Sequence, residues 1–254
     1  MGKNINQDRF VFIIPARMES SRFPGKPLEP LGGKPVIDWV YENCKNSVFC
    51  EEAYIATDSD QIVRHCQKTN KKCIPTGKQN CASDRVAEAS LKISTEWIVE
   101  VQGDEPLLWS EIIDAWLNKS LKYRHKNEID LFLSIAKLSQ TEADNPNFVK
   151  IIRNVNGKLQ WVSRSRIPNN LKKPFGGEYF RHSGFHLWRK ESLINFSQVK
   201  PSLIEESEDT HATRIVENNF VAQTIELPDT QAIDNPEDIS KAELILQNLG
   251  KRNG

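Results

Sequence analysis

Two short segments carry the side chains with the clearest chemical use. The first follows an apolar run from Phe10 to Ile14, and its glycine, Gly25, would let backbone N–H groups approach a ligand. Its cations could offset the spread negative charge of a polyphosphate. It lacks the GxxxxGK[ST] pattern of a Walker A loop. The segment predicts a polyphosphate site, and the alternative is a solvated loop with incidental charges. Its cationic and hydroxyl side chains are Arg17, Ser20, Ser21, Arg22 and Lys26.

The second segment is Gln102-Gly103-Asp104-Glu105-Pro106, which follows the predicted strand Ile98 to Val101. A carboxylate suits a hard cation such as Mg²⁺, and an adjacent loop of Arg and Lys suits phosphates. Taken alone, this segment could be an acidic turn in which Asp104 caps a helix that begins at Pro106. Taken with the first segment, it favours a site for a nucleotide and Mg²⁺.

Both segments follow predicted strands of a parallel sheet, at the edge where open α/β sheets bind ligands. Short apolar runs alternate with helical spacing through the first half of the chain, which predicts an α/β fold. Asp60 is the expected N-cap of the second helix, and Ser83 or Asp84 is expected either to cap the third helix or to contact a ligand. The predicted strands are 10–14, 52–57, 73–75 and 98–101, and the predicted helices are 36–44, 61–69, 81–93 and 110–122.

The second half of the chain has a different pattern. Runs at 131–138, 148–153 and 159–163 predict strands, and the turn Asn154 to Gly157 predicts a hairpin, so a small antiparallel lobe is expected. The basic loop 172–177 is either a mobile surface segment or a lid over a substrate. A further strand, 180–188, places His182 and His186 on one face, where we expect hydrogen bonds rather than metal ligation because no third ligand is near.

The remaining elements are a polar helix, a strand and a last helix. Residues 204–218 predict a helix with a solvated acidic face, and residues 222–226 predict a strand. Asn235 is the expected cap of the last helix, with Pro236 at its first position, and Asp234 lies just outside that cap.

Composition limits the classes of function. The 254 residues contain 34 Lys and Arg and 34 Asp and Glu, so no overall basic field favours nucleic acid or an anionic membrane. No apolar signal region or membrane-length run is present, which predicts a soluble, cytoplasmic protein. The five cysteines form no CxxC pair, which favours free thiols over a zinc site or a disulfide framework.

Six motifs in order carry a family resemblance: FVFIIPARMESSRFPGKP, VEVQGDEP, NPNFVKII, VSRSRIP, RHSGFH and AIDNPED. In these the chain resembles the CMP-Kdo synthetases, the 3-deoxy-manno-octulosonate cytidylyltransferases. The resemblance implies a Rossmann-like nucleotide-diphospho-sugar transferase fold, an α/β fold whose mostly parallel central sheet is flanked by helices, with a smaller antiparallel dimerisation lobe. It also implies one domain, 1–254, with a nucleotide-binding part at about 8–128, an acceptor and dimer lobe at about 129–190, and C-terminal helices at about 191–250.

The resemblance further implies a Mg²⁺-dependent reaction of CTP with a sugar 2-keto acid, release of pyrophosphate, a homodimer, and a role in surface polysaccharide or lipopolysaccharide synthesis. Asp104 and Asp234 would ligate magnesium and, with Arg17 and Lys26, would form the catalytic set. The residues expected to bind the nucleotide are Pro15, Ala16, Arg17, Ser20, Arg22, Lys26, Ser83, Arg85 and Gln102.

The acceptor half departs from the family pattern. RHSGFH stands where the family has RHLGIY, and THATR stands where the family has LEQLR, so His186, His211 and Ala212 replace Tyr, Glu and Gln. The residues expected to bind the acceptor are Arg164, His182, His186 and His211. Loss of specific hydrogen-bond partners predicts a changed acceptor. The alternatives are a cytidylyltransferase for another acidic sugar, a phosphonate or a polyol phosphate, an enzyme for a different nucleotide, and a non-catalytic nucleotide-binding homologue.

Overall fold

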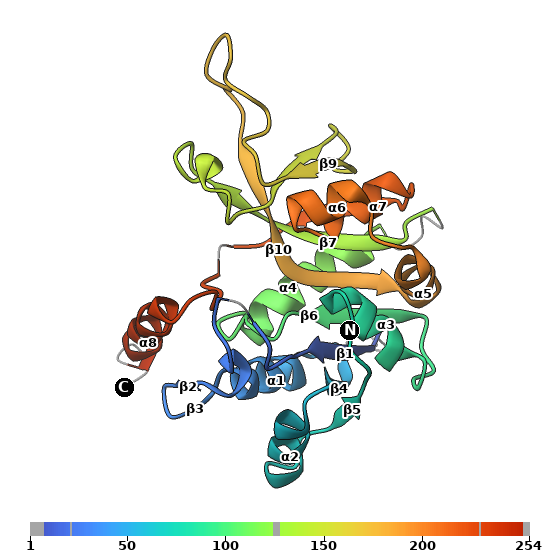
Figure 1. Ribbon diagram of the computed structural model, residues 1–254, viewed down its shortest axis with the longest axis vertical. Coiled ribbons are helices and arrows are strands. Elements are labelled where there is room, and N and C mark those ends of the chain that lie inside the picture. Colours follow the sequence, from blue (N-terminus) through green and yellow to red (C-terminus); the bar gives the residue numbers. More distant parts are fainter. Residues whose placement is uncertain (1–7, 21, 124–127, 229, 251–254) are drawn as a thin grey trace, which may run out of the picture.

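The computed structural model describes residues 8–20, 22–123, 128–228 and 230–250, and one large sheet runs through them (Figure 1). Its strands lie in the order β11-β7-β10-β6-β1-β4-β5, and β8 and β9 extend from β10. The strands are β1 (Phe10–Pro15), β4 (Cys50–Thr57), β5 (Cys73–Pro75), β6 (Trp97–Val101), β7 (Leu131–Leu138), β8 (Lys150–Arg153), β9 (Leu159–Ser163), β10 (Tyr179–Arg189) and β11 (Ala222–Glu226), and a separate ribbon pairs β2 (Pro30–Leu31) with β3 (Lys34–Pro35).

The sheet has a parallel part and an antiparallel part. β1 is parallel to β4 and β6, β4 is parallel to β5, and β11 is parallel to β7. β10 runs antiparallel to β6, β7 and β8, and β8 and β9 form the expected hairpin. The predicted α/β fold, with a mostly parallel sheet and a smaller antiparallel part, is confirmed.

Helices cover both faces of the sheet, because alternate side chains of each buried strand point to opposite faces. In β1, Phe12 and Ile14 pack with side chains of α1, α2 and α4, whereas Val11 and Ile13 pack with side chains of α3, α5 and α7. The helices are α1 (Val36–Asn46), α2 (Asp60–Lys68), α3 (Ala82–Ser90), α4 (Ser110–Leu121), α5 (Lys190–Gln198), α6 (Leu203–Glu208), α7 (Ala212–Glu217) and α8 (Glu237–Gly250), with short 3-10 turns η1 (Lys26–Leu28) and η2 (Glu142–Asp144).

Several helix ends differ from the sequence predictions. Ser59, not Asp60, is the N-cap residue of α2, and Cys81, not Ser83 or Asp84, caps α3, since its sulfur accepts a hydrogen bond from the Asp84 N–H. α4 begins only at Ser110, so Asp104 caps no helix at Pro106.

The expected helix 204–218 is two helices. Asp209 adopts φ +45° between α6 and α7, a left-handed conformation that interrupts the helical hydrogen bonds. The break lets α7 turn back so that its Arg214 reaches Glu205 of α6, and the expected solvated face is therefore wrong at buried Glu205.

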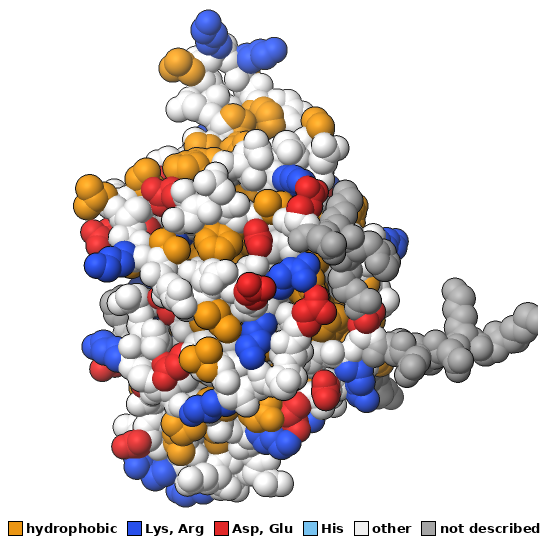
Figure 2. All heavy atoms as spheres, turned by 90° about the vertical axis from the view of Figure 1, so that its right-hand side faces the viewer, with side chains coloured by type: hydrophobic (Ala, Val, Ile, Leu, Met, Phe, Trp, Pro, Cys, Tyr) orange, Lys and Arg blue, Asp and Glu red, His pale blue; other side chains and the backbone are white. Residues whose placement is uncertain are grey.

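The surface carries charges of both signs. On the face shown in Figure 2, acidic and basic side chains are interspersed among hydrophobic ones, in keeping with the equal counts of the two charges. At the top of Figures 1 and 2 the loop between β9 and β10 projects from the body. In the described part of the chain, no helix is long and apolar enough to cross a membrane.

Candidate active site

A cavity of about 160 Å³ lies where β1 and β6 end and α3 begins. The two chemically informative segments therefore meet, as predicted. Eight of the nine residues expected at the nucleotide line this cavity, and Asp104 lies beside them: Pro15, Ala16, Arg17, Ser20, Arg22, Lys26, Arg85 and Gln102.

Two glycines allow the walls of this cavity to approach one another. A Cβ atom at Gly103 would lie 2.8 Å from the carbonyl oxygen of Pro15, so a side chain there would push the end of β1 away from the β6 loop. A Cβ atom at Gly184 would lie 2.7 Å from Cγ of Gln102, so β10 could not pass so close to that side chain. These contacts explain why glycine is needed at both positions.

Lys26 connects the two predicted magnesium ligands. Its ammonium donates to Asp104 Oδ2 at 2.7 Å and to the Ile233 carbonyl at 2.6 Å, directly before Asp234. The Ile233 N–H donates in turn to the backbone carbonyl of Asp104. Asp234 forms an ion pair of 3.1 Å with Arg22. Asp104 and Asp234 thus lie in adjoining, mutually bonded segments, and each faces a cation.

A second cavity, of about 410 Å³, adjoins the first. Arg22 and Asp104 line both cavities, so they mark the junction. The second cavity mixes cations, carboxylates and amides, which suits an acidic ligand with hydroxyl groups. Among the residues that line it are Asn145, Asn147, Arg181, His182, Gln231, Asp234 and Lys241.

The junction fits a magnesium ion by the chemistry of its donors. Asp104 and Asp234 both line the second cavity, and their side chains are 30% and 42% exposed, so both can bind a hydrated cation. In the described residues, no group of three or more His, Cys, Asp and Glu is arranged to hold a metal by itself. Two carboxylates are nevertheless what Mg²⁺ commonly takes from a protein when water and phosphate oxygens supply the other ligands.

A neighbouring acid, Glu105, is fully buried behind Asp104. Burial, with the negative charge of Asp104, raises the pKa of Glu105 to about 7. Its carboxylate accepts a hydrogen bond from the Thr230 hydroxyl, on the segment that leads to Asp234. Glu105 therefore links the loop after β6 to the segment before Asp234 through a buried hydrogen bond.

Glu100 is a buried acid beside the candidate site that the sequence prediction missed. It lies in β6 on the face that packs against α3, and its side chain is completely buried. Its carboxylate accepts hydrogen bonds from the Ser83 hydroxyl at 2.9 Å, the Gln102 amide at 2.6 Å and the Trp188 indole at 3.0 Å. Burial alone would raise the pKa of Glu100, but His186, His211 and the Ser83 hydroxyl together hold it below its ordinary value.

The three histidines expected at the acceptor lie close to one another, but His186 and His211 do not line either cavity. Nε2 of His182 lies 2.6 Å from Nε2 of His186, and the ring of His211 lies 6.2 Å from that of His182. Burial lowers the pKa of both His182 and His211, and the neighbouring His186 adds to that effect. His182 lines the second cavity, whereas His186 is only 1% exposed and lies behind it.

Arg214 holds the helix that carries His211. Its guanidinium donates to Glu205 and to Asp84 Oδ1, 2.8 and 2.9 Å away, and lies 4.5 Å from the centre of the Phe196 ring. All of these charged groups are buried. The triad connects α3, α6 and α7, and therefore fixes the position of His211 relative to Ser83.

Three residues of the predicted site lie elsewhere or act differently. Arg164 donates to the carbonyls of Glu208 and Asp209 and does not line either cavity. Ser83 points to Glu100 and His211 and not into the nucleotide cavity. The Gly25 N–H donates to the Met18 carbonyl, so it closes its own loop and does not point to a ligand.

Comparison with known proteins agrees with this geometry. The profile of the Cytidylyltransferase family matches residues 11–228. The chain therefore belongs to the cytidylyltransferase family, whose members are nucleotidyltransferases.

More particularly, the chain is similar to the CMP-Kdo synthetases, as its motifs predicted. It is 35% identical over 253 residues to a 3-deoxy-manno-octulosonate cytidylyltransferase of Thermodesulfovibrio yellowstonii and 32% identical over 238 residues to one of Chloroherpeton thalassium, and each match covers 93% of this chain and 97% of the relative. A solved structure of CMP:2-keto-3-deoxy-manno-octonic acid synthetase complexed with CTP matches with a TM-score of 0.86 at 28% identity, over 94% of this chain and 99% of the other.

Proposed function

We propose that this protein is a Mg²⁺-dependent cytidylyltransferase that joins CTP to Kdo or a Kdo-like sugar 2-keto acid and releases pyrophosphate. The observation that carries the proposal is the shared position of Asp104 and Arg22, which line both the nucleotide cavity and the second cavity. A phosphate held in the first cavity and a hydroxyl held in the second would meet there. The relatives named for this reaction support the choice of substrates.

The residues at the junction of the two cavities have different proposed roles. Arg17, Arg22 and Lys26 would bind the triphosphate, and Gln102 would lie near the base. Asp104 and Asp234 would hold the magnesium ion, which when bound neutralises phosphate charge and orients the reacting groups. Positioning and charge neutralisation account for most of the catalysis in such a site.

Asp104→Asn and Asp234→Asn test the assignment of the metal ligands. Each variant should lower turnover by at least about a hundredfold while the fold survives, because both side chains lie at a partly exposed edge. Pyrophosphate release from CTP, measured across a range of Mg²⁺ concentrations, checks this. Near wild-type turnover at limiting Mg²⁺ in either variant would show that its carboxylate is not a ligand. Asp114→Asn, on α4 and outside both cavities, is the matched control.

The identity of the acceptor is the finer part of the proposal. His186 and His211 stand where the family has a phenol and a carboxylate, so we predict that a related acid is preferred over Kdo itself. Comparison of kcat/KM for Kdo with that for other 2-keto sugar acids, phosphonates and polyol phosphates checks this. Kdo proving best by tenfold or more would contradict the prediction. His211→Glu with Ala212→Gln should raise activity toward Kdo, and competition among CTP, UTP and ATP tests the nucleotide.

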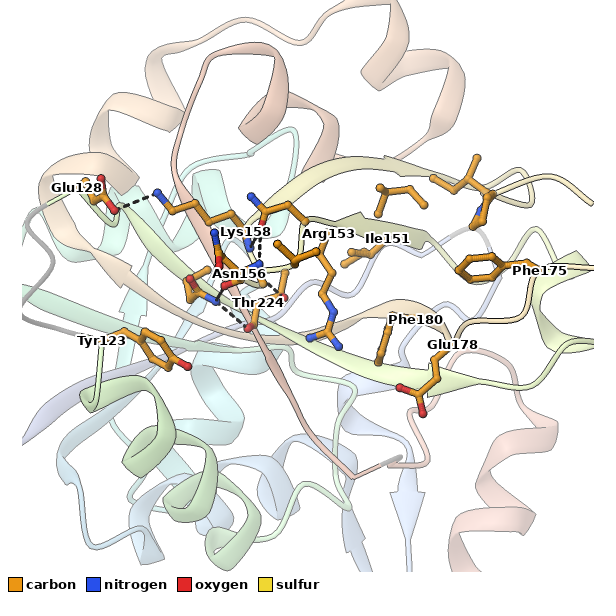
Figure 3. A pocket seen from close by; sticks show the side chains of 17 residues that line it. Tyr123, Glu128, Ile151, Arg153, Asn156, Lys158, Phe175, Glu178, Phe180 and Thr224 are labelled. Carbon is orange, nitrogen blue, oxygen red and sulfur yellow. Dashed lines mark hydrogen bonds and ion pairs between the residues drawn. The ribbon is translucent and has the colours of Figure 1, made fainter.

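We also propose the homodimer that the family resemblance implies, formed through the antiparallel part of the fold. A groove of about 1160 Å³ runs beside the β8–β9 hairpin, and Figure 3 shows Ile151, Arg153 and Phe180 along it. Val155 at the hairpin tip is fully exposed, and Leu171 in the projecting loop is 88% exposed. Contact with a second copy would remove this apolar surface from water.

Light scattering tests the dimer. Val155→Asp with Leu171→Asp should convert a dimer to a monomer, whereas Leu244→Asp, on exposed α8, should not. A wild-type protein that is monomeric at micromolar concentration would refute the proposal.

A further inference from the structure

The structure contains a row of three titratable groups that leads from the interior to the second cavity. Glu100 lies innermost, with no exposed surface, and its Oε2 is 3.5 Å from Nδ1 of His186. Nε2 of His186 is 2.6 Å from Nε2 of His182. His182 reaches the cavity that Asp104 and Asp234 also line. Metal ligation and nucleotide binding do not require such a row.

The two imidazoles meet through their edges. Their planes differ by 6° and their centres are 4.9 Å apart, so the two rings are nearly parallel. If the rings were stacked face to face, their closest atoms would be about 3.5 Å or more apart. A separation of 2.6 Å between the two nitrogens is therefore an in-plane hydrogen bond.

The backbone is shaped to make this contact. On a regular strand, residues four apart lie about 13 Å from each other and their side chains cannot meet. In β10 the register with β7 shifts between His182 and His186, and Gly184 lies in that interval against Gln102. Such irregularities re-aim side chains and are frequent beside active sites. Meanwhile, His186 stays directly opposite Glu100 in the pairing with β6.

The groups that face each ring nitrogen assign the protons. An ionised carboxylate can only accept, so Nδ1 of His186 carries the proton that faces Glu100. Nε2 of His186 is then the acceptor, and Nε2 of His182 is the donor. The lone pair of His182 is left on Nδ1. Among the buried side-chain nitrogen and oxygen atoms that the structure describes, Nδ1 of His186 alone lacks a hydrogen bond, because 3.5 Å is long for one. That gap can shorten when the imidazole becomes charged.

We propose that His182 is the general base of the reaction and that His186 and Glu100 form the relay that takes up the proton. This inference rests on the proposed function. The acceptor O–H bond breaks as its oxygen bonds to the α-phosphorus, and the bond from that phosphorus to the β-phosphate oxygen breaks to release pyrophosphate. The proton goes to Nδ1 of His182, whose Nε2 proton passes to Nε2 of His186. Glu100 stabilises the resulting imidazolium, and the proton returns to solvent by the same path when products leave.

The surroundings of the row favour a neutral His182 before the reaction. Burial keeps the pKa of His182 well below its ordinary value of 6.5, so it is a free base at neutral pH. Glu100 places a negative charge 3.5 Å from the His186 imidazole, so it can compensate a proton that arrives on the row. The other polar and charged groups that act on the row come from β10, α3, α6 and α7: Arg181, Ser83, Glu205, His211 and Arg214.

The experiment compares His182→Gln and Glu100→Gln with the wild type in pyrophosphate release from CTP and a 2-keto sugar acid. General-base catalysis typically contributes a factor of about 10² to 10⁴, so His182→Gln should lower kcat by about a hundredfold or more, and Glu100→Gln by at least about tenfold. KM for CTP should stay within about threefold. In the wild type, kcat should fall as the pH drops to the lowered pKa of His182, well below 6.5, and this acid limb should be absent from His182→Gln. Ionisation of the substrates affects both proteins alike, so only the difference is assigned to His182.

Two further measurements separate catalysis from structure. Free imidazole should restore part of the activity of His182→Ala, because His182 lines an open cavity, and a structural role would not respond. His65→Gln is the matched control, since His65 also pairs with a carboxylate, Asp38 at 2.8 Å, but lies outside both cavities. Its kcat and pH profile should equal those of the wild type.

The outcomes distinguish this inference from the proposed function. A wild type without turnover on any 2-keto sugar acid would overturn both. An active wild type whose His182→Gln variant keeps its kcat and its acid limb would overturn the relay alone. If Glu100→Gln does not fold, the kcat of His182→Gln and the imidazole rescue still test the relay. His182 lines the cavity, so its substitution is less damaging to the fold.

Discussion

Lys26→Met should change the affinities for CTP and for magnesium in opposite directions. In the free protein the Lys26 ammonium, 13% exposed, lies between the Asp104 carboxylate at 2.7 Å and the Ile233 carbonyl at 2.6 Å. Lys26 is therefore expected both to bind the triphosphate and to compete with magnesium for the Asp104 carboxylate. Methionine keeps an unbranched side chain that is one atom shorter, and it removes the ammonium with its charge and its N–H donors.

The expected magnitudes follow from these contacts. A hydrogen bond to a charged group contributes about 1.5–3 kcal/mol, so loss of the ammonium should raise the dissociation constant of CTP by about 10- to 100-fold. The Coulomb attraction between Lys26 and Asp104, 2.7 Å apart, is at most about 6 kcal/mol at an effective dielectric constant near 20, and the 30% exposure of Asp104 reduces it further. Release of Asp104 should therefore lower the half-saturating Mg²⁺ concentration by up to about tenfold.

Calorimetry of CTP binding and a Mg²⁺ titration of turnover at saturating CTP measure the two effects separately. Lys34→Met is the control, because Lys34 pairs with Glu42 outside both cavities. An unchanged affinity for CTP would remove Lys26 from the triphosphate site. A half-saturating Mg²⁺ concentration that rises would show that Lys26 supports metal binding and does not compete with it.

Two predictions concern stability. Arg214→Met should lower the free energy of unfolding by about 3–5 kcal/mol, because it leaves Glu205 and Asp84 buried without a partner. Urea denaturation measures this. A loss below about 1 kcal/mol, the value expected for a partly exposed pair such as Arg153 with Glu226, would contradict it. His182 and His211 have lowered pKa values in the folded state, so the unfolded chain binds more protons below pH 6.5 and stability should fall with pH there. The slope should reach about 1.4 kcal/mol per pH unit for each histidine, and denaturation of His182→Gln with His211→Gln should give a flatter curve; an equal slope would refute the assignment.

The sequence was most informative where an apolar strand ends and polar residues follow. That pattern located β1 and β6, and both loops after them lie at one cavity, because parallel strands bring their carboxyl ends to one edge. Asp234 was found only through the family motif, since nothing local distinguishes it from other acids near a helix start.

What the sequence did not predict depended on partners distant in the chain. Glu100 alternates with Val99 and Val101, and only the folded sheet shows that its face is covered by α3 and β10 residues. A charged residue among apolar ones in a predicted strand was the available signal. Glu205 lies in an acidic stretch typical of a solvated helix, yet Arg214 neutralises it after the turn at Asp209. Arg164 was expected to bind the acceptor, but its guanidinium donates to backbone carbonyls. No local sequence pattern distinguishes an arginine with that role from one that binds a ligand.

The contact between Lys26 and Ile233 joins positions separated by 207 residues in the sequence. Segments so far apart come together late in folding, because the intervening chain must be ordered first. The sheet can therefore form before the junction between the cavities is complete. Leu227, Thr230 and Ile233 in the connection between β11 and α8 are buried, so a protease can cut there only when this segment opens. Such a cut would separate Asp234 from the core strands, and we expect it to leave a folded protein that retains its nucleotide cavity and lacks turnover. The rate of limited proteolysis in this connection would therefore report how often the junction between the cavities opens, without any substitution in the protein.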